Sequence, residues 1–161
     1  MGGHGALSLY LRQFHPSLAP SPPSPSASAT SFKAASAFAP ICHPSACPWG
    51  KKAFGGYLRS VDEWAAYDSL LLLPSKAEEP PTSSSSSSSA TAAELHIKIS
   101  YGTQDQFYKD GQLLPEAFEA RARELGWAPD AVRVDREEGY DHSYYFVSPP
   151  PSRALRSLLI A

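Results

Sequence analysis

The stretch LHIKISYGTQDQFYKDGQLLPEAFEARARELGWAPDAVRVD, residues 95–135, carries the pattern that decides the fold. Its first five residues alternate between apolar and polar side chains, which predicts a half-buried strand. Residues 114–125 predict a helix, because Pro115 suits its first turn and Gly126 suits its end. Residues 131–135 predict a second strand. A strand, a loop, a helix and a strand in this order are typical of a parallel sheet with helices on its faces.

Three helices are predicted from apolar spacing or position. Near the N-terminus, apolar residues recur with the spacing of one helix face, and these are Leu7, Tyr10, Leu11 and Phe14. Residues 152–160 predict a closing helix. In the helix over residues 114–125, the face that we expect to be buried consists of Leu114, Ala117, Phe118, Ala122 and Leu125.

The middle of the chain predicts three shorter elements. Residues 33–40 are apolar and predict a short buried strand that ends at Pro40. Residues 49–58 and 62–73 predict two short helices over a surface, with Asp62 as a possible N-cap of the second.

Two segments of low complexity interrupt these elements. Residues 16–31 are rich in Pro, Ser and Ala, and residues 76–93 include seven consecutive serines. Neither segment can bury enough apolar area to offset the entropy of ordering it, so we expect two disordered loops. Long surface insertions cost little stability, so we expect one partial domain over residues 1–161 that contains both loops.

The composition excludes several classes of protein. The net charge is −2, and no dense cluster of Lys and Arg with interleaved aromatics occurs, so we expect no nucleic-acid partner. No apolar run approaches the roughly 18 residues of a membrane span, so we expect no membrane partner. Cys42 and Cys47 are too few for a disulfide framework or a zinc site, which favours reduced thiols in a cytoplasmic protein. The acid-free first third leaves an organelle transit peptide as an alternative.

A histidine and an acid lie in loops that follow two successive predicted strands. The stretch EGYDHSYYF, residues 138–146, places His142 in a glycine-led, aromatic loop, and an imidazole exchanges protons near neutral pH. The earlier loop contains Asp105. Together they resemble the Asp and His of a hydrolase triad, in which the acid orients the histidine. Asp110 and Asp141 are alternative acids, and spacing alone gives Asp105 only a modest preference.

These loops and three other segments resemble the S-formylglutathione hydrolases, the esterase D family of α/β-hydrolases. The matching segments are AFAPIC (37–42), CPWGKKAF (47–54), GTQDQF (102–107), GQLLP (111–115) and EGYDHSYYF (138–146). The resemblance covers most of the chain except residues 19–30 and 77–93. It implies the C-terminal part of an α/β-hydrolase fold, incomplete, in which Asp105 and His142 are catalytic.

The chain departs from this family at the nucleophile. The family's nucleophile turn reads GHSMGGHGAL and this chain opens MGGHGAL, so the nucleophilic serine would sit immediately before Met1. The backbone N–H of Met1 would then be an oxyanion-hole donor. No other G-x-S-x-G occurs in the chain, so we expect the chain to be inactive alone. Trp49 is a candidate substrate-pocket residue, for which core packing is an equal alternative.

The resemblance also implies a reaction and its setting. The reaction is hydrolysis of S-formylglutathione to formate and glutathione, a stage of formaldehyde detoxification, by a Ser–Asp–His mechanism with no metal or organic cofactor. The family implies a homodimer in the cytoplasm. Two other functions stay open: a non-catalytic interaction protein derived from the hydrolase, and a general carboxylesterase without glutathione preference.

Overall fold

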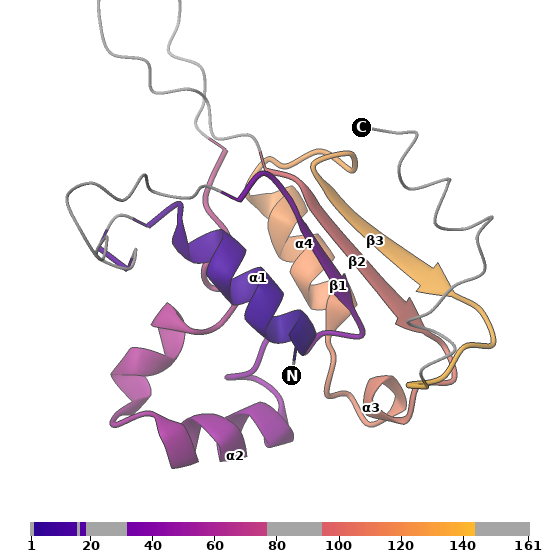
Figure 1. Ribbon diagram of the computed structural model, residues 1–161, viewed down its shortest axis with the longest axis horizontal. Helices are drawn as coiled ribbons and strands as arrows, with labels where there is room; N and C mark the ends of the chain where they lie inside the picture. The colour runs from indigo at the N-terminus through magenta and orange to yellow at the C-terminus, as the bar shows by residue number, and fades with distance from the viewer. Residues whose placement is uncertain (1, 16, 19–31, 77–94, 144–161) are drawn as a thin grey trace, which may run out of the picture.

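The computed structural model describes residues 2–15, 17–18, 32–76 and 95–143, which form a parallel three-stranded sheet flanked by helices (Figure 1). In spatial order the strands are β1 (Ala35–Phe38), β2 (Ile97–Gly102) and β3 (Val132–Glu137). The expected α/β class is confirmed, and each strand overlaps a segment that the sequence predicted as strand. The arrangement agrees with the C-terminal part of an α/β-hydrolase fold.

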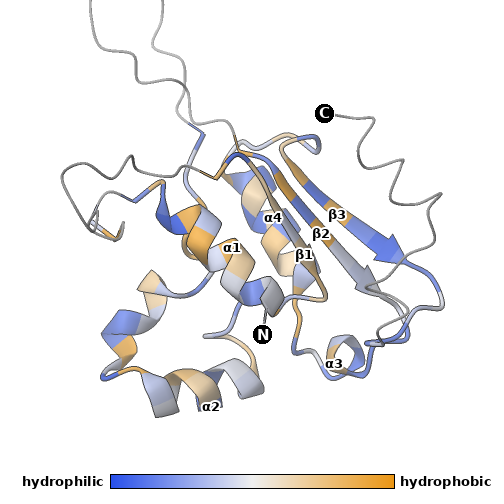
Figure 2. Cartoon of the chain, viewed as in Figure 1, coloured by the Kyte–Doolittle hydropathy of each residue, from blue (hydrophilic) through white to orange (hydrophobic). Residues whose placement is uncertain are grey.

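One face of the sheet is apolar because the parallel register aligns the apolar residues of the three strands. The residues of this face are Ala35, Ala37, Ile97, Ile99, Val132 and Val134. The opposite face carries charge: Lys98 Nζ lies 3.5 Å and Arg133 Nε 2.7 Å from the carboxylate oxygens of Asp135. Figure 2 shows the resulting hydrophilic end of β3. The core therefore lies on one side of the sheet.

Two helices cover the apolar face. They are α1 (Gly2–Arg12) and α4 (Pro115–Glu124), which are drawn on the same side of β2 and β3 in Figure 1. Both belong to one hydrophobic cluster with the apolar strand residues, through Leu7, Tyr10, Leu11, Phe118 and Ala122. Because the strand residues of that cluster share one face, α1 and α4 lie on the same side of the sheet.

The buried face that the sequence predicted for α4 is partly wrong. Phe118 and Ala122 are fully buried and Leu114 and Leu125 are half-buried, but Ala117 is exposed. The buried stripe begins at the first residue of the helix and continues through Phe118 and Ala122. Ala117 lies about 100° around the helix from Phe118, so it points away from the sheet.

Three short helices complete the described fold. α2 (Pro48–Tyr57) lies within one residue of its predicted bounds, whereas α3 (Gln106–Lys109) was not expected. The helix predicted over residues 62–73 is wrong. Only the 3-10 helix η1 (Val61–Ala66) forms there, turns follow it, and its N-cap residue is Ser60 rather than Asp62.

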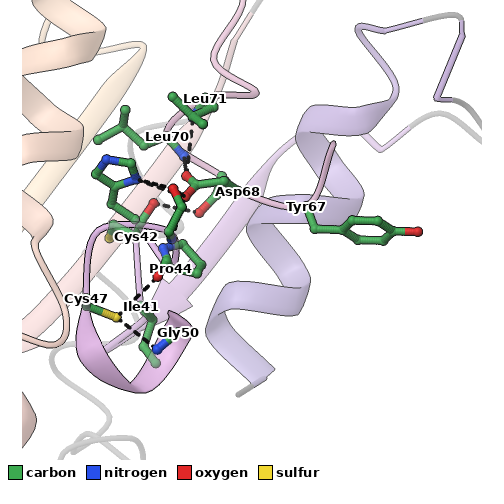
Figure 3. A network of polar contacts seen from close by, with 12 residues as sticks. Ile41, Cys42, Pro44, Cys47, Gly50, Tyr67, Asp68, Leu70 and Leu71 are labelled. Carbon is green, nitrogen blue, oxygen red and sulfur yellow. Dashed lines mark hydrogen bonds and ion pairs between the residues drawn. The ribbon is translucent and has the colours of Figure 1, made fainter. Parts of the chain in front are cut away.

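The carboxylate of Asp68 explains why that helix stops. Its Oδ1 accepts hydrogen bonds from the backbone N–H groups of Leu70, at 3.0 Å, and Leu71, at 3.4 Å (Figure 3). An aspartate that binds nearby backbone donors offers the chain an alternative to the helical hydrogen-bond pattern. The segment therefore turns at Asp68 instead of continuing as a helix.

The same carboxylate joins two segments that lie far apart in the sequence. Its Oδ2 accepts hydrogen bonds from His43 Nδ1 at 2.8 Å, from Ser45 N at 2.9 Å and from Ser45 Oγ. Asp68 is fully buried, so these donors satisfy a charge that burial would otherwise penalise strongly. The Asp68 network thus fixes the turn before α2 to the turn after η1.

Several expectations fall outside the described residues. The residues outside the described ranges are 1, 16, 19–31, 77–94 and 144–161. They include nearly all of both expected loops and the whole closing helix over 152–160. Those expectations stay predictions, as does the single partial domain. Among the helices of the described ranges, none is both long and apolar enough to cross a bilayer.

Replacement of the Asp68 carboxylate should destabilise the chain. In Asp68→Asn, an amide N–H₂ would face groups that are themselves donors, and a charged hydrogen-bond acceptor would be lost. We expect the free energy of unfolding to fall by about 3 kcal/mol, measured by urea denaturation. Asp62→Asn, at an exposed position of η1, is the matched control and should change it by less than about 0.5 kcal/mol. Equal unfolding midpoints for the two variants would contradict the role of the Asp68 network.

Candidate active site

Asp105 is held in the loop that leaves the carboxyl end of β2. Its side chain is fully buried, and it caps α3 because Oδ1 accepts a 2.8 Å hydrogen bond from Phe107 N. A cap of this kind satisfies a backbone donor that a helix start would leave unpaired. The cap leaves the second carboxylate oxygen, Oδ2, directed away from the helix and available to another residue.

His142 supplies the partner for that oxygen. It follows β3 through a turn at Gly139, whose φ of 78° suits glycine, and its Nδ1 lies 2.6 Å from Asp105 Oδ2. The histidine side chain is 47% exposed while the aspartate is fully buried. The structure therefore brings together the two residues that the sequence predicted as catalytic.

The geometry assigns the proton of the imidazole. A carboxylate only accepts hydrogen bonds, so Nδ1 must carry the proton that it donates to Asp105. The neutral ring then keeps a free lone pair on Nε2, where it can accept a proton from a nucleophile. The arrangement of Asp105 and His142 can thus act as an oriented general base.

Hydrogen bonds between the two loops maintain this arrangement. Gln104 N donates to Tyr140 O at 2.8 Å, and Gly139 N donates to Thr103 Oγ1 at 3.0 Å. A Cβ on Gly102 would lie only 2.1 Å from Tyr140 O, so the close approach of the loops requires glycine at this position. These contacts fix the histidine loop to the acid loop just before His142.

The two alternative acids lie in other contacts. Asp110 Oδ1 accepts a hydrogen bond from Gln106 Nε2 at 2.7 Å, and Asp141 Oδ1 accepts one from Ser143 N at 3.1 Å. Hydrogen bonding to Ser143 lowers the pKa of Asp141. Neither acid is hydrogen-bonded to the His142 ring as Asp105 is.

His43 and Asp68 form a second histidine–carboxylate pair, which the sequence did not reveal. The His43 side chain is only 23% exposed, and the Asp68 oxygen that it contacts also accepts a hydrogen bond from Ser45. Nothing in the spacing of two residues 25 positions apart in a turn-rich segment marks them as partners. The pair anchors the Asp68 network rather than opening onto solvent.

Trp49 lies on α2 beside an apolar pocket. This pocket has a volume of about 270 Å³, and its lining includes His4, Trp49, Phe54 and Tyr67 but neither Asp105 nor His142. Trp49 is 39% exposed, so its ring is not core packing alone. Its role in binding substrate stays a prediction. Met1, the expected oxyanion-hole donor, lies outside the described residues.

His4 and the cysteines are held in unreactive forms. Burial lowers the pKa of His4, whose Nδ1 lies 3.1 Å from Ile41 O, so the ring is neutral. Burial also raises the pKa of Cys42 and Cys47, so both free thiols stay protonated. Cys47 Sγ accepts a hydrogen bond from Gly50 N and caps α2. Within the described ranges, no cluster of three or more His, Cys, Asp or Glu side chains could hold a metal ion.

Comparisons with known proteins agree on one family. The family model Esterase, described as "Putative esterase", matches residues 1–153. The chain is 38% identical to S-formylglutathione hydrolase of Rattus norvegicus, 39% to that of Bos taurus and 40% to that of Arabidopsis thaliana, each over 149 residues. Each alignment covers 92% of this chain but only 41–42% of the relative. The chain thus spans less than half the length of these relatives.

A side chain at position 102 should separate the two loops. In Gly102→Ala, the added methyl group would overlap Tyr140 O, so the histidine loop must move away from Asp105. We expect a loss of about 1–3 kcal/mol in the free energy of unfolding and faster amide exchange at Gln104. Gly55→Ala, on α2 with open space around the added Cβ, should be neutral or stabilising by up to about 1 kcal/mol. Unchanged amide exchange at Gln104 in Gly102→Ala would contradict the close approach.

Proposed function

We propose that this chain, which belongs to the esterase family, supplies the acid and the base of a serine thioesterase that hydrolyses S-formylglutathione to formate and glutathione. The observation that carries the proposal is the 2.6 Å contact between His142 Nδ1 and the fully buried Asp105, with the histidine ring half exposed. The S-formylglutathione hydrolases among its relatives support the substrate. A glutathione thioester also needs no metal to be cleaved.

The proposed reaction has two acyl-transfer steps. His142 Nε2 takes the proton of the nucleophilic serine as its oxygen attacks the thioester carbonyl, and it returns the proton to the departing glutathione sulfur. A water molecule then loses a proton to the same nitrogen and attacks the formyl ester, and Nε2 returns the proton to the serine oxygen as formate leaves. Asp105 stays ionised throughout, orients the ring, and stabilises the imidazolium that forms in each step.

We expect the nucleophile in the turn that would lead into α1. No G-x-S-x-G occurs in the 161 residues, while the MGGHGAL segment matches the residues that follow the serine in the family. The first turn of α1 lies against the carboxyl end of β1, since a Cβ on Gly3 would be 3.0 Å from Phe38 O. A serine before Met1 would therefore emerge at the edge of the sheet that holds Asp105 and His142. The backbone N–H of Met1 would bind the oxyanion.

The setting of this activity follows from the same resemblance. The proposed enzyme is a cytoplasmic homodimer of formaldehyde catabolism. Two measurements separate the rival functions, substrate turnover and binding. A general carboxylesterase would turn over simple esters as readily as the thioester. A non-catalytic interaction protein would bind a full-length relative without adding activity.

The 161-residue chain should have no hydrolase activity of its own. In a serine hydrolase, loss of the nucleophile lowers turnover by about a million-fold, and the chain contains no nucleophile turn. We expect no release of glutathione from S-formylglutathione above the rate in buffer, measured by thiol titration. Saturable turnover that disappears in His142→Ala would refute this proposal.

A chimera should restore the activity. It joins this chain to the part of the Arabidopsis thaliana relative that precedes the aligned region, including its nucleophile turn. We expect saturable thioester hydrolysis, and a fall in kcat of about ten-thousand-fold in Asp105→Asn, because an amide would favour the wrong tautomer of His142. Asp141→Asn, beside His142 in the sequence, is the matched control and should retain kcat within about twofold. An equal loss in both variants would reject Asp105 as the orienting acid.

A further inference from the structure

Phe107 is an exposed aromatic residue whose ring contacts the imidazole of His142. It lies on the short helix α3, is 44% exposed, and takes no part in the hydrophobic cluster of the sheet. Its ring meets the imidazole of His142 edge to face, with centroids 4.9 Å apart and an interplanar angle of 73°. Aromatic rings at this distance and angle attract one another beyond the area that they bury.

We propose that Phe107 is a positioning residue, which holds the His142 imidazole in the orientation that its hydrogen bond to Asp105 requires. The inference rests on the proposed function, for which this orientation is the essential geometry. No property of the core requires an aromatic side chain at position 107, since the residue is 44% exposed and lies outside the hydrophobic cluster.

The imidazole needs such a contact because one hydrogen bond does not fix a ring. The bond from Nδ1 to Asp105 sets the position of one atom, while the side chain is 47% exposed and can still tilt about that contact. A second contact, on the flank of the ring, removes this freedom.

Phe107 is well placed for this task because it contacts both members of the pair. Its backbone N–H donates to Asp105 Oδ1 at 2.8 Å, while its ring touches the histidine that is bonded to Oδ2. The backbone of Phe107 is fixed again by a 2.8 Å hydrogen bond from Gln112 N to Phe107 O. The ring therefore starts from a backbone position that is tied to the acid.

The test measures the order of the His142 ring in the 161-residue chain by ¹³C relaxation. In the unsubstituted chain we expect a ring order parameter of about 0.8, and in Phe107→Leu a value below about 0.6. Phe107→Tyr keeps an aromatic edge and should restore the order. Tyr57→Leu, which removes an 85% exposed aromatic residue from α2, is the control and should leave the His142 ring unchanged.

Activity of the chimera gives an independent measurement. Phe107→Leu should lower kcat by about three- to tenfold with KM unchanged, and Phe107→Tyr should recover it. If the chimera has no activity, the proposed function fails, while the ring order still decides the role of Phe107. Equal ring order in the unsubstituted chain and Phe107→Leu, or no recovery in Phe107→Tyr, would overturn the proposal. Loss of cooperative unfolding in Phe107→Leu would also overturn it, because Phe107 would then be a structural residue.

Discussion

The parallel register of β2 with β3 is the constraint on which the candidate site depends. Gly102 lies opposite Glu137, so the two strands end together and their loops leave the sheet at the same edge. The absence of a side chain at Gly102 then lets the histidine loop approach until Gln104 N bonds Tyr140 O. A slip of β3 by one residue would turn all of its side chains to the opposite face of the sheet. It would also break the pairing of Gly102 with Glu137 and the hydrogen bond between Gln104 and Tyr140. The 2.6 Å hydrogen bond of His142 is thus a consequence of strand pairing.

The chain contains two histidine–aspartate pairs that use the same chemistry for different ends. Both rings bond a fully buried carboxylate through Nδ1, at 2.8 Å from Asp68 and 2.6 Å from Asp105. Asp68 divides its oxygens among several donors from two turns, and it holds backbone segments together. Asp105 gives one oxygen to a helix cap and the other to His142, whose ring opens to solvent. Exposure of the ring, rather than the pairing itself, distinguishes a candidate base from an anchor.

Sequence reasoning succeeded where one local pattern determines the outcome. Alternation predicted β2, and Pro115 with Gly126 predicted α4 within one residue at each end. It failed where side-chain contacts decide: Asp68 bonds the backbone of Leu70 and Leu71, and the helix expected over residues 62–73 does not form. The loops that carry Asp105 and His142 were predictable from strand order, and the choice of Asp105 needed the family resemblance. The contact of Phe107 with His142 was not predictable, since it depends on how two loops meet in space.

The strands β2 and β3 and the helix α4 between them form one continuous piece of chain, whereas β1 joins the sheet from much earlier in the sequence. The partners Asp105 and His142 are only 37 positions apart and belong entirely to that piece. Contacts between nearby parts of a chain generally form sooner during folding than contacts between distant parts. The order of folding events therefore favours early assembly of the acid and base, with α1 and β1 docking afterwards. Slow or failed docking of α1 and β1 would therefore leave the loops that carry Asp105 and His142 largely formed.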